Sequence, residues 1–239
     1  MLTAALALTT IPVLAALVSG VVAVIRRPGV RLTSALQHFA AGVVFSAAAI
    51  ELLPPVLERS PLVAVSGFAA GVVVMFGFRK LGDVISARRE ARGAVGLPVG
   101  LAVATGIDFH IDGVILGAGF AASSSVGVLL TVALAVEYLF VGLSLSATLP
   151  ASVPRRVVAL APAALALLTV AGTAVGVLLL GDASPVVLSG VLAFGAVAFM
   201  YLATEELLVE AHERGETSLG SVGFFVGFLV YLVLGELVG

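Results

Sequence analysis

The chain has 239 residues, of which 61% are hydrophobic and 11% are charged, and its formal net charge is −2. A soluble domain carries about 25% charged residues, so the composition excludes a soluble globular protein and indicates an integral membrane protein without a soluble domain. The absence of cysteine excludes both disulfide bonds and thiolate metal ligands.

Eight apolar stretches are long enough for a helix that crosses a bilayer, which needs about 20 residues. Runs of Ala, Val, Leu and Gly favour helices, and no stretch alternates with the period of two typical of a membrane β-barrel. The first stretch has no basic leader, so we expect a membrane helix there and not a signal peptide. The predicted helices cover residues 2–25, 32–57, 61–80, 95–121, 126–149, 155–180, 185–211 and 217–238.

Basic residues predict the orientation of these helices. All but one of the 12 Lys and Arg residues fall in loops that follow odd-numbered helices, and Arg59 is the exception. Such loops are cytoplasmic by the positive-inside rule, so we predict a multi-pass protein of the cell membrane with both termini outside. The residues in the cytoplasmic group are Arg26, Arg27, Arg31, Arg79, Lys80, Arg88, Arg89, Arg92, Arg155, Arg156 and Arg214.

The sequence also contains an internal repeat. A shift of 155 residues gives eight identities over the 21 ungapped positions 39–59, with Glu51 falling on Glu206. The two matched helices cross the membrane in opposite directions, so the repeat is inverted, as in many secondary transporters. We therefore predict one all-α transmembrane domain, residues 1–239, with eight helices in a 3+2+3 arrangement: helices 1–3 at 1–80, helices 4–5 at 95–149 and helices 6–8 at 155–238.

Three acids lie in the predicted central helices. Asp108 and Asp112 are four residues apart, so they share one helix face. Glu137 lies near the centre of the next helix, which a short loop at 122–127 makes antiparallel. A charged residue at the bilayer centre costs about 2.5–3.5 kcal/mol, and carboxylates are hard ligands for divalent cations. The cluster therefore predicts a cation site, and the alternative is a set of protonated acids that bond to backbone or serine groups.

Other polar residues are weaker candidates. Glu51 and the pair Glu205 and Glu206 lie toward helix ends, where acids can reach the membrane surface. His110 is a candidate ligand, although it lies about 200° around the helix from Asp108, which favours a packing role. His38 and His212 stand at cytoplasmic helix ends, where a solvated histidine is favoured over a ligand to a departing metal.

Three segments together resemble the ZIP (Zrt-, Irt-like) family of divalent metal transporters. In predicted helix 4 the family has His-Asn-x-Pro-Glu-Gly-x-x-x-Gly, and this chain has Asp108-Phe109-His110-Ile111-Asp112-Gly113 followed by Gly117. Helix 2 is similar in its stretch 39–45 and in Glu51-Leu52-Leu53-Pro54-Pro55, and helix 7 is similar in Glu205-Glu206-Leu207-Leu208-Val209-Glu210-Ala211-His212.

The resemblance implies a secondary transporter that moves a divalent cation such as Zn²⁺, Mn²⁺ or Fe²⁺ toward the cytoplasm. Its implied metal ligands are Asp108, Asp112, Glu137, Glu206, Glu51 and His110. Within the family pattern, Phe109, Tyr138 and Val141 stand where ligands of one of two adjacent metals would be. The remaining carboxylates could form a single all-oxygen site, which favours harder ions such as Mn²⁺, Fe²⁺ or Mg²⁺ over Zn²⁺.

Two alternatives stay open at this stage. The same frame could carry another substrate, such as a proton-coupled solute, or the protein could be a relative that does not transport, such as a metal sensor or a structural subunit. We expect no enzymatic activity, because the sequence has no nucleotide-binding motif and no nucleophile paired with a base. The expected partners are a metal ion and the lipid bilayer, with no nucleic acid and no organic cofactor, and a homodimer is left open.

Overall fold

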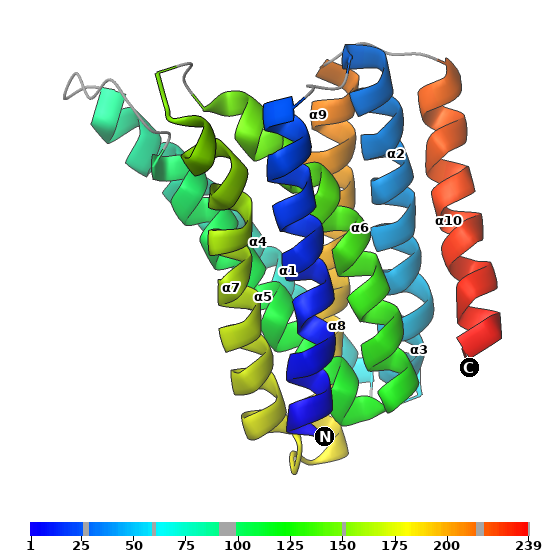
Figure 1. Ribbon diagram of the computed structural model, residues 1–239. Coiled ribbons are helices and arrows are strands. Elements are labelled where there is room, and N and C mark those ends of the chain that lie inside the picture. Colours follow the sequence, from blue (N-terminus) through cyan, green and yellow to red (C-terminus); the bar gives the residue numbers. More distant parts are fainter. Residues whose placement is uncertain (26–28, 59–60, 91–98, 150–151, 214–217, 239) are drawn as a thin grey trace.

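A computed structural model describes residues 1–25, 29–58, 61–90, 99–149, 152–213 and 218–238 of the chain (Figure 1). Within these ranges the secondary structure is helical and contains no strand. The helices are α1 Leu2–Ile25, α2 Val30–Ala47, α3 Leu53–Leu57, α4 Pro61–Glu90, α5 Val99–Ala122, α6 Ser124–Thr148, α7 Arg155–Leu180, α8 Pro185–Tyr201, α9 Leu208–Glu213 and α10 Ser218–Val238. Two π-helical segments, η1 Ala48–Leu52 and η2 Leu202–Leu207, join α2 to α3 and α8 to α9.

The apolar lengths of these helices confirm the predicted class, an all-α membrane protein. In the described part of the chain, 7 segments are long and apolar enough to cross a bilayer, and α10 adds a shorter apolar helix at Val222–Val238. The segments run alternately up and down, and both termini lie at the same end of the bundle (Figure 1). Which end of the bundle faces the cytoplasm stays a prediction. Five of the arginines considered for it lie outside the described residues: Arg26, Arg27, Arg59, Arg92 and Arg214.

Some predicted helix boundaries were wrong. The helix predicted at 61–80 continues to Glu90 as α4, because residues 81–90 contain no proline to end it once the apolar stretch is over. The predicted loop at 122–127 is a single residue, Ser123, whose hydroxyl accepts a hydrogen bond from the Val126 amide at 3.1 Å and so caps α6. The predictions at 2–25 and 155–180 match α1 and α7.

Four segments form the interior of the bundle. Half or more of the apolar window is buried in α2–α3, α5, α6 and α8–α9, compared with 17% in α4. Helix α5 also packs closely against α7, because glycines meet there: a side chain at Gly113 would collide with the backbone of Thr169, and one at Gly172 with that of His110. This close contact brings α7 against the site described below.

The π segments fall at equivalent places in the two predicted repeats. Shifting η1 by 155 residues gives 203–207, which lies within η2, Leu202–Leu207. The helix contacts are paired in the same way: α2 packs on α10 as α8 packs on α4, and α1 packs on α6 as α7 packs on α5. A π segment inserts an extra residue into a helix turn, so two equivalent insertions give the sequence repeat a structural counterpart.

Candidate functional site

The structure brings Asp108, Asp112 and Glu137 together inside the bundle. One carboxylate oxygen of each lies within 4.8 Å of the corresponding oxygens of the other two. Asp112 and Glu137 are buried, with 2% and 0% of their surface exposed, and Asp108 is partly buried. Three acidic side chains therefore share a small volume in membrane-spanning helices, where each charge needs a partner.

The local sequence explains this convergence. Asp108 and Asp112 are one turn apart on α5, and α5 joins α6 through Ser123 alone. Asp108 lies 14 residues before the last residue of α5, and Glu137 lies 13 residues after the first residue of α6. In two antiparallel helices joined by one residue, these positions fall at nearly the same depth. The i, i+4 spacing and the short turn together place the three carboxylates.

A tyrosine and a threonine hold one of these carboxylates in place. The Tyr138 hydroxyl donates a hydrogen bond to Oδ2 of Asp112 at 3.2 Å, and it lies 2.6 Å from Oγ1 of Thr169 on α7. The Tyr138 ring stacks on Phe109 with a centroid distance of 3.8 Å and an interplanar angle of 23°. Both aromatic rings are fully buried. One oxygen of Asp112 is thus engaged, and the space beside it is filled by two rings.

Glu137 has no such donor. Its side chain is fully buried, and in the described part of the chain its carboxyl finds no partner outside the group of acids, where only the neighbouring Asp112 carboxyl interacts with it. Burying a polar group without a hydrogen bond costs several kcal/mol, and burying an unpaired charge costs more. The Glu137 carboxyl can therefore be satisfied by a proton shared with Asp112 or by a bound cation.

The spacing of the cluster suits a metal ion. Oxygen ligands lie about 2.0–2.1 Å from Mg²⁺ and about 2.3–2.6 Å from Ca²⁺, so two ligands of one ion are at most about 4–5 Å apart. The oxygens of the group all lie within 4.8 Å of one another, so a small inward movement of the side chains would bring them onto the smaller ion. An ion between the three carboxylates would supply the missing partner of Glu137, with water or a further acid completing its shell.

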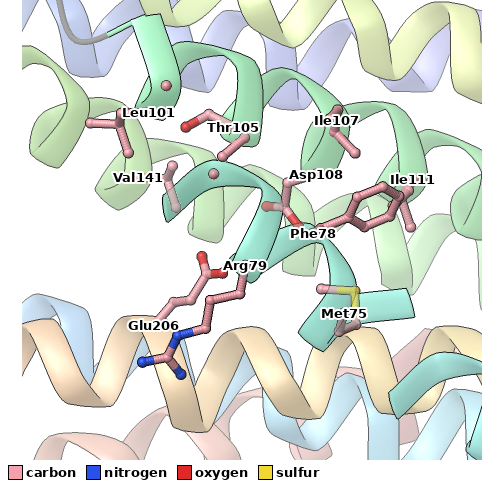
Figure 2. A pocket seen from close by; sticks show the side chains of 13 residues that line it. Met75, Phe78, Arg79, Leu101, Thr105, Ile107, Asp108, Ile111, Val141 and Glu206 are labelled. Carbon is pink, nitrogen blue, oxygen red and sulfur yellow. The ribbon is translucent and has the colours of Figure 1, made fainter. Parts of the chain in front are cut away.

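A cavity of about 290 Å³ gives access to Asp108. It lies between α4, α5, α6 and η2, and its charged lining residues are Asp108, Glu206 and Arg79 (Figure 2). Glu206 is exposed, and Figure 2 shows its side chain next to that of Arg79, below Asp108. The Arg79 Nη1 atom lies 3.2 Å from Oε2 of Glu205 and 3.4 Å from the Tyr201 hydroxyl. Glu206 therefore lines the route to the cluster without belonging to it.

The remaining predicted ligands lie elsewhere. Glu51 is buried in η1, where it faces α10 next to Gly235. His110 lies on another face of α5, where its Nδ1 atom is 3.3 Å from the Leu168 carbonyl oxygen and its ring lines an apolar groove. The rings of His38 and His212 are in contact, with centroids 5.1 Å apart and planes tilted by 57°. Neither Glu51 nor His110 belongs to the carboxylate group.

Two residues near the carboxylate group, Thr169 and Arg79, were not predicted from the sequence to lie there. Thr169 lies on α7, which was not predicted to contribute, and its signal is weak: two threonines, Thr169 and Thr173, one turn apart in an otherwise apolar helix. Arg79 was assigned to orientation alone, although an arginine within the apolar part of α4 was itself a signal.

No model of a known protein family matches the chain, and no curated protein sequence matches it. A function is therefore proposed from the geometry of the carboxylate group alone.

Proposed function

We propose that this protein carries a divalent metal cation across the membrane through a site formed by Asp108, Asp112 and Glu137. The observation that carries the proposal is the group of three acids, whose ligand oxygens lie within 4.8 Å of one another and in which Glu137 is fully buried. A purely structural network would pair such acids with hydrogen-bond donors from the rest of the protein, and among the described residues Glu137 has no donor of this kind. A site for a travelling ion has to leave ligand atoms unsatisfied when the ion is absent.

The proposed fold is ZIP-like, with eight membrane helices in a 3+2+3 arrangement and an inverted repeat. Support comes from the equivalent π segments η1 and η2 and from the paired helix contacts. Helices α5 and α6 form the central pair and contribute the ligands. With the loops rich in arginine and lysine on the cytoplasmic side, both termini lie outside. Movement of the ion toward the cytoplasm is what the resemblance to the ZIP family implies.

We propose one ion per chain, held by oxygen ligands. The stack of Phe109 on Tyr138 fills the volume next to Asp112, where the family resemblance would place further ligands. No histidine belongs to the group of three acids. An all-carboxylate site favours Mn²⁺, Fe²⁺ or Mg²⁺ and makes Zn²⁺ a weaker substrate.

Proton binding is the second candidate function. The hydrogen bond from Tyr138 to Asp112 and the closeness of three acids are also compatible with carboxyls that share protons. In that case the cluster would couple proton movement to another solute, and divalent ions would not be carried.

Uptake by proteoliposomes separates these functions. Purified protein is reconstituted, and entry of Mn²⁺, Fe²⁺, Zn²⁺ and Mg²⁺ is measured with and without a pH gradient. The proposal predicts uptake of at least one ion, which Asp108→Asn and Glu137→Gln each abolish. Glu236→Gln, which changes an exposed acid on α10, is the matched control and keeps uptake. Proton flux without uptake of any divalent ion would favour the second candidate.

A further inference from the structure

The cavity that leads to Asp108 carries a positive charge as well as negative ones. Arg79 lines it together with Asp108 and Glu206 (Figure 2). A guanidinium in the path of a cation repels it and competes with it for the same carboxylates. The position of the Arg79 guanidinium therefore affects whether a cation can enter the cavity.

In this structure Arg79 bonds to two residues that do not line the cavity. Its Nη1 atom bonds to Oε2 of Glu205 at 3.2 Å and to the Tyr201 hydroxyl at 3.4 Å. Glu205 itself does not line the cavity, whereas the next residue, Glu206, does. Of these two consecutive acids on η2, Glu205 bonds to Arg79 and Glu206 lines the cavity.

We propose that Glu205 and Tyr201 form a latch that holds the Arg79 guanidinium away from Asp108, so that Arg79 controls the entry of cations into the cavity. When the latch is broken, the guanidinium is attracted to the two carboxylates that line the same cavity, Glu206 and Asp108. Arg79 then acts as a tethered competitor of the travelling ion. Glu205 and Tyr201 are positioning residues, because they act through Arg79. The role of the latch in cation entry rests on the proposed function, in which the cavity leads a cation to the carboxylate group.

An ordinary surface ion pair is the alternative reading. The side chains of Arg79 and Glu205 are 53% and 46% exposed, and such pairs contribute little to stability. In that case each residue would only add its own charge to the local potential. Removing Glu205 would then lower cation access by the same factor whether or not Arg79 is present.

Because the chain has no native cysteine, access can be measured at a single introduced thiol. Ala104→Cys places it on the cavity wall. The rates of modification by a cationic and by a neutral methanethiosulfonate reagent are compared in reconstituted protein, and their ratio reports access for positive charge. The latch predicts that Glu205→Gln lowers this ratio by about tenfold and that Arg79→Gln raises it by a similar factor. Tyr201→Phe should lower it less.

The decisive comparison is the double variant. With Arg79→Gln already present, Glu205→Gln should change the ratio by less than about twofold, because no guanidinium is left to release. Equal effects of Glu205→Gln in both backgrounds would overturn the latch. The series is repeated with Val141→Cys on another wall, and absence of reaction at both positions would overturn the cavity as an access route. Glu236→Gln should leave the ratio unchanged.

The thiol rates need no transported metal, so the two proposals fail separately. If proteoliposomes take up no divalent ion but the rates are non-additive as predicted, the proposed function is wrong and Arg79 still controls access to the cavity. If uptake is observed and the rates are additive, the transport proposal stands and the latch is wrong.

Discussion

The hydroxyl of Tyr138 donates a hydrogen bond to Oδ2 of Asp112 at 3.2 Å, across the contact between α6 and α5. Thr169 extends this bond to α7, with its Oγ1 atom 2.6 Å from the same hydroxyl. Three helices are therefore tied at the proposed ion site. The bond fixes the orientation of the Asp112 carboxyl, so the proposed ion would meet this ligand already in place.

Removing this hydroxyl should weaken ion binding. Tyr138→Phe keeps the ring on Phe109 but loses the bonds to Asp112 and Thr169, so we expect about tenfold weaker Mn²⁺ binding. Stability should fall by about 1–2 kcal/mol. Tyr231→Phe is a matched control, because Tyr231 is also fully buried but its hydroxyl has no hydrogen-bond partner among the described residues. Similar affinity losses in both variants would show that the Tyr138 bond has no special role.

The contact between α5 and α7 should be sensitive to a single methyl group. A side chain at Gly113 would meet the backbone of Thr169 and Thr173, so Gly113→Ala should cost about 1–3 kcal/mol and lower the melting temperature. Gly77→Ala on α4 is the control, because nothing lies within 4 Å of the added carbon. It should be neutral or stabilise the helix by up to about 1 kcal/mol. Thermal unfolding in detergent measures both, and equal melting temperatures would contradict the packing described.

The buried Phe109 ring should contribute far more to the free energy of unfolding than a ring that faces lipid. Phe109→Ala removes a side chain that is 0% exposed and should cost about 3–5 kcal/mol, whereas Phe225 is 70% exposed and Phe225→Ala should cost little. Denaturation of the two variants in the same detergent compares them. If Phe225→Ala lost as much stability as Phe109→Ala, another protein surface would have to cover α10.

Orientation can be tested with single cysteines at the two ends of the bundle. Asp182 is exposed in the turn between α7 and α8, and Gly29 is exposed just before α2. We expect an impermeant thiol reagent added to intact cells to label Asp182→Cys and to spare Gly29→Cys. Labelling of Gly29→Cys alone would reverse the proposed orientation. Labelling should become equal after the cells are opened.

The central carboxylate group could be predicted from the sequence because local rules determine it. Asp108 and Asp112 are four residues apart, and a short turn places Glu137 on the adjoining helix at matching depth. No long-range packing information is needed for either step. The same holds for α1 and α7, whose ends coincide with the ends of their apolar stretches.

The features that were missed depend on packing between distant segments. Thr169 reaches Tyr138 only because glycines bring α5 and α7 close together, and no local pattern reports that approach. Arg79 and Glu205 are 126 residues apart in sequence. The length of α4 was underestimated because hydropathy marks the part of a helix inside lipid, and a helix can continue beyond it.

Titration calorimetry of purified protein with Mn²⁺ tests the central proposal most directly. We predict one ion per chain, with affinity at least about tenfold weaker in Asp108→Asn and in Glu137→Gln and unchanged in Glu236→Gln. Unchanged affinity in both site variants, or no binding of any divalent ion by the unmodified chain, would contradict the carboxylate site.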